Sequence, residues 1–380
     1  MKKISTYWRI ILILTGVTLF FGVLSFIPSF CDWYTLHVYK NVAAAYAHLT
    51  NPLPFLLGEI LFYLAILFVT VVFVCSLLRL PLRRKVGFKR FHTGLSKSFL
   101  MTTCIVLLLY MLLWLLPFRT TPLTFGVSPE KKYTYEDLTE LTIHVSEQIN
   151  QITENIPRDS DGHIIVPDDA MESLKSGMQS LQDEFPLYNS FYPSAKFALA
   201  SDFLEWSEIG GFTIPYTAEI CLNRYEKPYK LYYYMLYAHE EAHHLGYFRE
   251  NEGVFFGILS CLRSDCELVQ LCGYYEAYHY LKKQAYLDCL EGYVSKEMYT
   301  DFKSKTSLIP LTQQDQDYFY ALRTSLYEEN VNTSMENMFK ESTEKVAEVG
   351  WETQDKILKE NNYDGVVLLL LRYFHRGRSF

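Results

Sequence analysis

Three long apolar stretches near the start of this 380-residue chain constrain its fold more than any other feature. They cover approximately residues 10–30, 54–78 and 99–118, and Glu59 is the one charged residue in them. A helix needs about 20 apolar residues to cross the hydrocarbon core of a bilayer. Buried helices of a soluble core rarely supply three uncharged runs of this length so close together. We therefore expect a membrane domain over residues 1–118 with three transmembrane helices, and membrane lipid as a partner.

Charge divides the chain at the same place. Residues 1–117 contain 11 Lys and Arg and two acids, a balance of +9. The chain totals are 35 basic and 43 acidic residues, which leaves 24 basic and 41 acidic residues in 118–380, a balance of −17. This pattern is typical of a membrane module followed by an acidic soluble module. An acidic surface also argues against nucleic acid as a partner.

The short loops predict the orientation. Seven Lys and Arg lie between Arg79 and Lys97, whereas the first loop carries Lys40 alone. Since basic loops stay in the cytoplasm, we expect a cytoplasmic amino terminus and an extracytoplasmic C-terminal domain. The alternative for the first stretch is a cleaved signal peptide. Its apolar region is too long, and no small-x-small cleavage site follows closely, which favours an uncleaved anchor.

Two features of the membrane and cysteine content leave alternatives. Glu59 lies near the outer end of the second stretch, and an ionisable residue within a membrane helix is a candidate functional residue. The favoured interpretation is that its side chain extends to the membrane interface. The eight cysteines form no C-x-x-C pair, and five of them follow residue 118. An odd number predicts no disulfide framework, so we expect small core residues.

Beyond a linker at residues 119–129, a mainly helical domain is expected over 130–380. Apolar residues recur at helical spacing from Leu138 to Ile152, and again from Met171 to Phe185, where Asp168 is a plausible N-cap. Residues 212–214 and 219–222 read as two short strands joined by a turn. A strand beside a metal-site helix can pair with an extended substrate, or the two strands can simply pack against the domain core. The sequence does not distinguish these two roles.

The run His239-Glu240-Glu241-Ala242-His243 is an H-E-x-x-H pattern. On a helix, residues i and i+4 lie on one face, so both imidazoles can reach one metal ion, Zn2+ above all. Glu240 would then act as general base on a water activated by the zinc. Pro228 favours a helix start upstream and Gly246 a helix end downstream, so the pattern falls in a predicted helix.

A catalytic zinc usually takes three protein ligands. After Gly246, residues 249–259 read as a second helix that folds back, and Glu250 or Glu252 could complete the site. The two acids are about 200° apart around a helix, so one of them at most can face the metal. Glu250 lies closer to the turn and suits a solvated helix start, which favours Glu252 as the ligand and leaves Glu250 as the alternative.

These residues resemble a known family. The segment Ala238–Tyr247, the acids Glu250 and Glu252, and the upstream Gly-Gly-Phe-Thr-Ile-Pro-Tyr-Thr-Ala-Glu219 are similar to the bacterial membrane proteins of domain-of-unknown-function family 3810. The resemblance implies three N-terminal spans and a zincin-like site whose third ligand is a glutamate. It implies ligand roles for His239, His243 and Glu252 and a base role for Glu240. Gly253-Val254 departs from the family's usual Ala-Asn, which removes a hydrogen-bonding asparagine.

The remaining candidates are weaker. Tyr274 and His279, on an expected helix at 265–281, could stabilise an oxyanion, although a packed aromatic face explains them better. Residues 300–380 hold further helical patterns, such as Met335 to Val346, and an apolar run at 366–371 that is too short to span a bilayer.

The sequence thus predicts a membrane-anchored, zinc-dependent metallopeptidase-like protein that hydrolyses peptide bonds outside the cytoplasm, with an unidentified peptide or protein substrate. The alternative is a catalytically degenerate metal-binding protein that acts as a surface sensor or scaffold. Three spans with a single acid argue against a transporter or channel.

Overall fold

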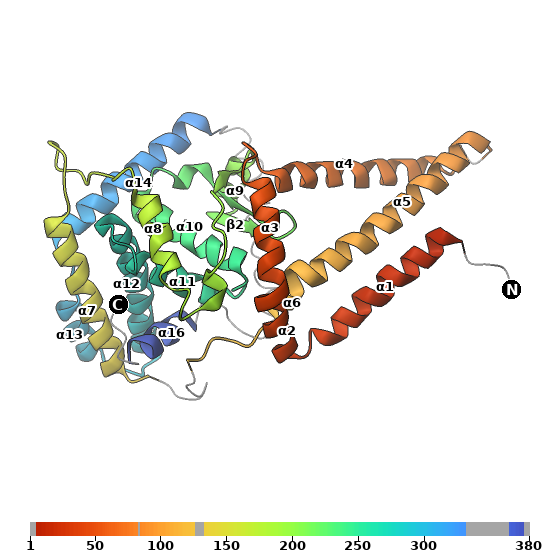
Figure 1. Ribbon diagram of the computed structural model, residues 1–380. Coiled ribbons are helices and arrows are strands. Elements are labelled where there is room, and N and C mark those ends of the chain that lie inside the picture. The colour runs from red at the N-terminus through yellow and green to blue at the C-terminus, as the bar shows by residue number, and fades with distance from the viewer. Residues whose placement is uncertain (1–4, 83, 126–132, 332–364, 376–380) are drawn as a thin grey trace. The chain divides into compact units, whose positions relative to one another are not determined.

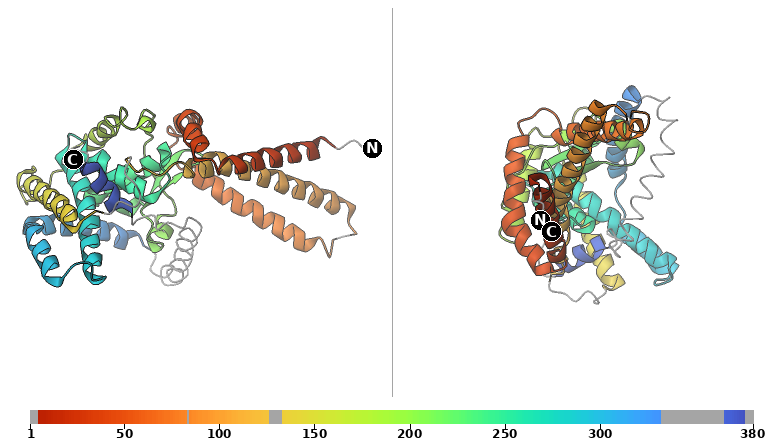
Figure 2. Two further views of the ribbon diagram at one scale, coloured as in Figure 1. Left: turned by 90° about the horizontal axis from the view of Figure 1, so that it is seen from below. Right: turned by 90° about the vertical axis from the view of Figure 1, so that its right-hand side faces the viewer.

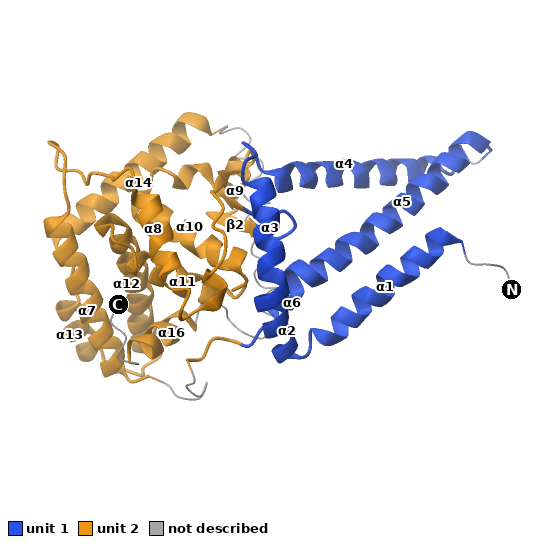
Figure 3. Cartoon of the chain, in the orientation of Figure 1, with its two compact units in different colours: residues 1–121, 214–219 blue, residues 122–213, 220–380 orange. Residues whose placement is uncertain are grey.

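The computed structural model describes residues 5–82, 84–125, 133–331 and 365–375 (Figure 1). The described residues are mainly helical, as expected from the sequence, and they include a three-stranded sheet of which two strands were predicted. The chain divides into two compact units, shown in different colours in Figure 3. Unit 1 comprises residues 1–121 and 214–219, and unit 2 comprises residues 122–213 and 220–380.

In the described part of unit 1, three helices are long and apolar enough to cross a membrane. They are α1 (Thr6–Leu24), α4 (Leu57–Leu78) and a continuous helix over Val86–Phe118. The last consists of α5 (Val86–Tyr110), a π-helical segment η2 (Met111–Leu115) and α6 (Leu116–Phe118). No side chain of α4 is buried, although nearly all of them are apolar, which suits a helix surrounded by lipid.

Unit 1 also contains helices that the hydropathy pattern did not predict. The first loop is itself helical: α2 (Pro28–Tyr34) continues through a π-helical segment η1 (Thr35–Tyr39) into α3 (Lys40–Thr50). The third apolar helix begins at Val86, well before the expected start at residue 99. Its first turns carry basic residues, which hydropathy assigns to a loop because they cannot lie in hydrocarbon.

The segment 214–219 belongs to unit 1 through specific hydrogen bonds. The Glu219 carboxylate accepts the backbone N–H groups of Leu57 and Gly58, at 3.0 and 2.8 Å. These are free donors in the first turn of α4, where a negative charge is also favoured by the helix dipole. The Thr50 hydroxyl donates to the Thr217 carbonyl at 3.1 Å. Glu59, in the same first turn of α4, accepts a hydrogen bond from Tyr63.

Unit 2 is built around three mutually packed helices, α10, α11 and α12, which lie side by side in Figures 1 and 2. Further helices and helical turns surround them. In the described part of unit 2 the helical elements are α7 (Tyr135–Asn155), α8 (Ala170–Gln179), η3 (Pro186–Tyr188), α9 (Ser201–Trp206), η4 (Arg224–Glu226), α10 (Lys230–Leu245), α11 (Glu250–Leu262), α12 (Glu267–Leu290), α13 (Lys296–Lys305), α14 (Pro310–Asn330) and α16 (Gly365–Phe374).

The helices of unit 2 follow the apolar spacing. All five apolar positions that predict α7, from Leu138 to Ile152, are buried. The apolar run at residues 366–371 lies in α16, where nearly all its side chains are buried in the core of unit 2. A short apolar helix therefore belongs to a protein core here, as its length allows. The pattern from Met335 to Val346 lies outside the described residues.

The two predicted strands are present as β2 (Gly211–Ile214) and β3 (Glu219–Leu222). With β1 (Lys196–Phe197) they form a sheet of order β1-β3-β2, in which β1 runs parallel to β3. All four β3 side chains are buried, whereas those of β2 are partly or fully exposed. Strand β2 is thus an edge strand.

Several local predictions need correction. The N-cap of α8 is Asp169, one residue after the expected Asp168, and its side chain makes no capping bond. Helix α10 begins at Lys230, just after Pro228, and α12 extends beyond the expected end at residue 281. Within the predicted linker, Phe125 is buried in the core of unit 2. All eight cysteines are free thiols.

Candidate metal centre

Helix α10 brings the two histidines of the H-E-x-x-H pattern together. The Nε2 atoms of His239 and His243, one helical turn apart, are separated by 3.0 Å. The Nδ1 atom of His243 lies 2.7 Å from the Tyr247 carbonyl oxygen, which can only accept a hydrogen bond. Nδ1 therefore carries a proton, and Nε2 is the atom that can offer a lone pair to a metal.

Glu250 supplies the third donor atom. Gly246, with φ +120°, ends α10 in a conformation that favours glycine, and the chain then folds back into α11. The Oε2 atom of Glu250 in the first turn of α11 lies 3.3 Å from Nε2 of His239 and 3.5 Å from Nε2 of His243. These three side chains form a group able to hold a metal ion.

Glu252, the residue that the sequence favoured, faces elsewhere. Its carboxylate accepts the backbone N–H of Leu123 at 2.8 Å and lies 4.0 Å from the Arg249 guanidinium. The structure therefore brings Glu250, and not Glu252, to the two histidines. The physical reason is helical phase: two residues rotate a side chain by about 200°, and the packing of α11 on α10 turns Glu250 inward.

Glycine in α11 allows this close packing. A Cβ atom at Gly253 would lie 2.7 Å from Cε1 of His243 and 3.0 Å from Cε1 of His239. At Gly257, one turn later, a Cβ atom would lie 3.2 Å from the backbone nitrogen of His239. The absence of a side chain at Gly253 thus contributes directly to the fit of the two imidazoles against α11.

The donor geometry fits zinc. Bonds of about 2.0–2.1 Å in a tetrahedral complex require ligand atoms about 3.3 Å apart. The three observed separations are 3.0, 3.3 and 3.5 Å. Two imidazole nitrogens and one carboxylate oxygen are a typical donor set for catalytic zinc, with the fourth position left for water or substrate.

Glu240 lies beside the group without joining it. It is buried, and the hydroxyl of Thr213 in β2 donates to its backbone carbonyl at 2.6 Å and approaches its carboxylate at 3.2 Å. Burial raises the pKa of the Glu240 carboxyl, and the nearby imidazoles oppose that rise. A buried carboxylate with a raised pKa is suited to accept a proton near neutral pH.

The three donor residues interact strongly in the metal-free chain. Burial alone would lower the pKa of His243, but the Glu250 carboxylate outweighs it and raises the pKa to about 9. Burial would likewise raise the pKa of Glu250, but the two imidazoles hold it well below its usual range. A proton therefore occupies the site that a cation would take, and metal binding must displace it.

Helix α12 contributes residues that the sequence analysis missed. Burial raises the pKa of Glu276 to about 7, opposed by the charge of His239. Burial also raises the pKa of Tyr280, one turn later, with contributions from Glu276 and Glu250. The two residues that the sequence suggested as oxyanion stabilisers lie in other surroundings than Glu276 and Tyr280. Tyr274 is buried in the core, and His279 is exposed. No short sequence motif identifies Glu276 and Tyr280 as site residues. The sequence shows only that they are four residues apart, on one face of a helix that follows the H-E-x-x-H pattern.

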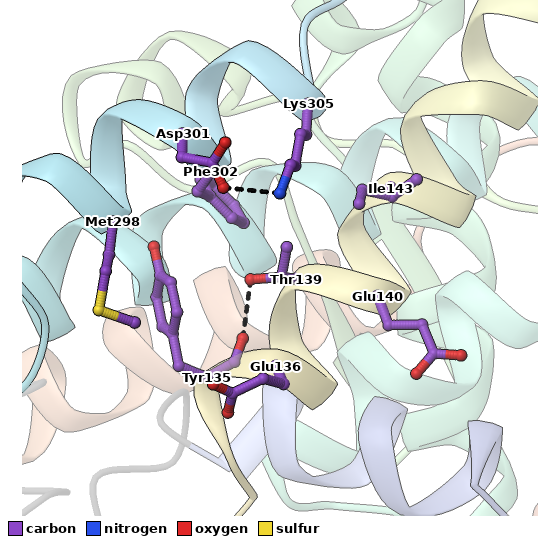
Figure 4. A pocket seen from close by; sticks show the side chains of 9 residues that line it. All are labelled: Tyr135, Glu136, Thr139, Glu140, Ile143, Met298, Asp301, Phe302 and Lys305. Carbon is purple, nitrogen blue, oxygen red and sulfur yellow. Dashed lines mark hydrogen bonds and ion pairs between the residues drawn. The ribbon is translucent and has the colours of Figure 1, made fainter.

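Other concavities and acidic groups in the described chain lie apart from this centre. A cavity of about 450 Å³ lies between α7 and α13 and is lined by residues such as Tyr135, Glu140 and Phe302 (Figure 4). It shares no residue with the metal group. Asp159, Asp161 and His163 also come together, but they lie on an exposed loop.

Comparison with known proteins decides the family. The model of the family described as protein of unknown function (DUF3810) matches residues 34–366, which covers most of the chain. The chain belongs to this family. The match spans the segment before the second apolar helix, the sheet, the H-E-x-x-H helix and α11. No curated protein and no solved structure matches the chain.

Proposed function

We propose that this protein is a membrane-anchored, zinc-dependent metallopeptidase that hydrolyses peptide bonds outside the cytoplasm. The observation that carries the proposal is the group of His239, His243 and Glu250, with separations that match a tetrahedral zinc site and with Glu240 beside it. Among the common uses of such a donor set with an adjacent buried glutamate, hydrolysis fits best.

Each residue has a defined task in this mechanism. His239, His243 and Glu250 would hold the zinc, which when bound supplies Lewis-acid polarisation of the substrate carbonyl and of a water. Glu240 takes a proton from the attacking water and returns it to the leaving amine. The Thr213 hydroxyl, bonded to the Glu240 carbonyl and close to its carboxylate, keeps that side chain in place.

The position of β2 supports a peptide as the substrate. An edge strand offers unpaired backbone donors and acceptors to which an extended peptide can add as a further strand. Strand β2 carries Thr213, which contacts Glu240, and a Cβ atom at Gly211 would lie 3.3 Å from Cγ of Glu240. A peptide paired with β2 would therefore lie beside the proposed general base.

The location rests on charge and hydropathy. The three apolar helices favour a membrane anchor, and the basic second loop favours a cytoplasmic position for that loop. Because one apolar helix lies between that loop and unit 2 in the sequence, a cytoplasmic loop implies an extracytoplasmic unit 2.

The test uses the full chain purified in detergent. We expect one zinc per chain and cleavage of an unstructured protein substrate. Glu240→Gln should keep the zinc and lower the cleavage rate at least about a hundredfold, because it removes the proton acceptor. Undiminished cleavage by this variant would refute the mechanism. Stoichiometric zinc with no cleavage of any substrate would favour the alternative, a metal-binding sensor or scaffold.

A further inference from the structure

Glu252, which the geometry removes from the ligand set, holds a different part of the chain. Its side chain is 3% exposed, and it accepts the backbone N–H of Leu123 at 2.8 Å. Leu123 lies in the segment 122–125, the first residues of unit 2 after the third apolar helix, which ends at Phe118. A hydrogen bond to a buried carboxylate is stronger than one between neutral groups.

The same segment has a second point of attachment on α11. Phe125 is 7% exposed, and its ring packs against Phe255, with centroids 5.5 Å apart. It also contacts Tyr373 of α16 at 5.6 Å. Because Phe255 follows Glu252 by three residues, both contacts lie on one face of α11. The segment is therefore fixed along the first two turns of the helix that carries Glu250.

These contacts hold the first turn of α11 from the side opposite the metal group. No side chain caps this helix at its N-cap residue, Arg249. Asn251, between the two glutamates, lies so close to Gly365 at the start of α16 that a Cβ atom there would come within 2.4 Å of its amide nitrogen. Neighbouring segments thus determine how the first turn of α11 is rotated about the helix axis. This rotation determines whether Glu250 faces the histidines.

We infer that the hydrogen bond from Leu123 to Glu252 positions Glu250, so that the metal centre is complete only when segment 122–125 is seated on α11. This inference rests on the proposed zinc site. Glu252 is a positioning residue that acts through Glu250, and the metal centre depends on the chain that leaves the third apolar helix. A shift of about 0.5 Å in Glu250 is enough to disturb coordination.

The test breaks the same hydrogen bond from both ends in the full-length chain in detergent. Glu252→Ala removes the acceptor, and Leu123→Pro removes the donor without changing α11. The matched controls are Glu252→Gln, which keeps an acceptor oxygen, and Leu123→Ala, which keeps the backbone N–H. Zinc affinity is measured by chelator competition, and the visible spectrum of the Co2+-loaded protein reports the coordination geometry.

We expect Glu252→Ala and Leu123→Pro each to weaken zinc binding about 10- to 100-fold and to alter the Co2+ spectrum, as loss of an outer partner of a ligand does. The controls should stay within about threefold of wild type. The double variant should bind no more weakly than either single variant, because both remove one interaction.

The outcomes separate this inference from the proposed function. If wild type binds zinc and both folded variants bind it equally well with an unchanged Co2+ spectrum, the inference is wrong and the zinc site stands. Additive losses in the double variant would also overturn it. If wild type binds no zinc, the proposed function fails and the inference with it.

Discussion

Replacement of Glu250 by glutamine tests the assignment of the third ligand most directly. Structural zinc sites with four ligands bind with about 10–16 kcal/mol, or about 2.5–4 kcal/mol per ligand. The Glu250 oxygen completes a triangle of donor atoms with sides of 3.0, 3.3 and 3.5 Å, so its loss removes one full ligand. The intrinsic loss of affinity should be about two to three orders of magnitude.

Proton displacement reduces this loss at neutral pH. The Glu250 carboxylate raises the pKa of His243 to about 9, so at pH 7.5 zinc must displace a proton at a cost of about 2 kcal/mol. In Glu250→Gln, His243 has no carboxylate partner at Nε2, its pKa falls, and that cost largely disappears. The net loss should therefore be about tenfold at pH 7.5 and should grow to a hundredfold or more at pH 9.

The assay is zinc competition with a chelator at both pH values, on the full chain in detergent. Glu252→Gln is the matched control, because it makes the same chemical change two residues away and should bind zinc like wild type at both pH values. Wild-type affinity in Glu250→Gln together with a loss in Glu252→Gln would refute the ligand assignment. A loss that does not depend on pH would refute the role of Glu250 in holding the His243 proton.

Three further predictions follow from packing, ion pairing and burial. Gly253→Val places branched carbons against both imidazoles, so zinc affinity in a chelator competition should fall at least about tenfold. Arg323→Met removes the cationic partner of Glu226 and Glu205, two largely buried glutamates, of which Glu205 keeps the Asn223 amide as a donor. This change should lower the free energy of unfolding by about 3 kcal/mol, whereas Lys305→Met at an exposed pair should cost less than about 0.5 kcal/mol; equal melting temperatures would contradict this. Burial lowers the pKa of His244 to about 4, so between pH 6.5 and 4 the unfolded chain binds one more proton at this residue. Stability should therefore fall by up to about 3 kcal/mol as the pH falls through that range, and His244→Phe should show a shallower fall in denaturant titrations at pH 7 and 4.5.

Local sequence patterns predicted most of the elements that surround the candidate site. The i, i+4 spacing of His239 and His243 is sufficient to bring two imidazoles together on any helix, and Gly246 marks the end of that helix. The Gly210-Gly211 break and the turn at Pro215 delimit the two short segments that predicted β2 and β3. The helical first loop was missed because its apolar runs are short, and no hydropathy window separates an amphipathic helix from a loop there.

The sequence by itself determined that this chain has three apolar helices of membrane length, a second module rich in acids, and a histidine pair on one helix face. These properties depend on composition and on spacing within a single helix. Tertiary structure alone decided that Glu250 joins the histidines while Glu252 binds the Leu123 backbone, and that Gly253 lies against the imidazoles. The reason is that the rotation of α11 about its axis is fixed by α10, α16 and the segment 122–125, which are distant in sequence and contribute no signal to the local pattern.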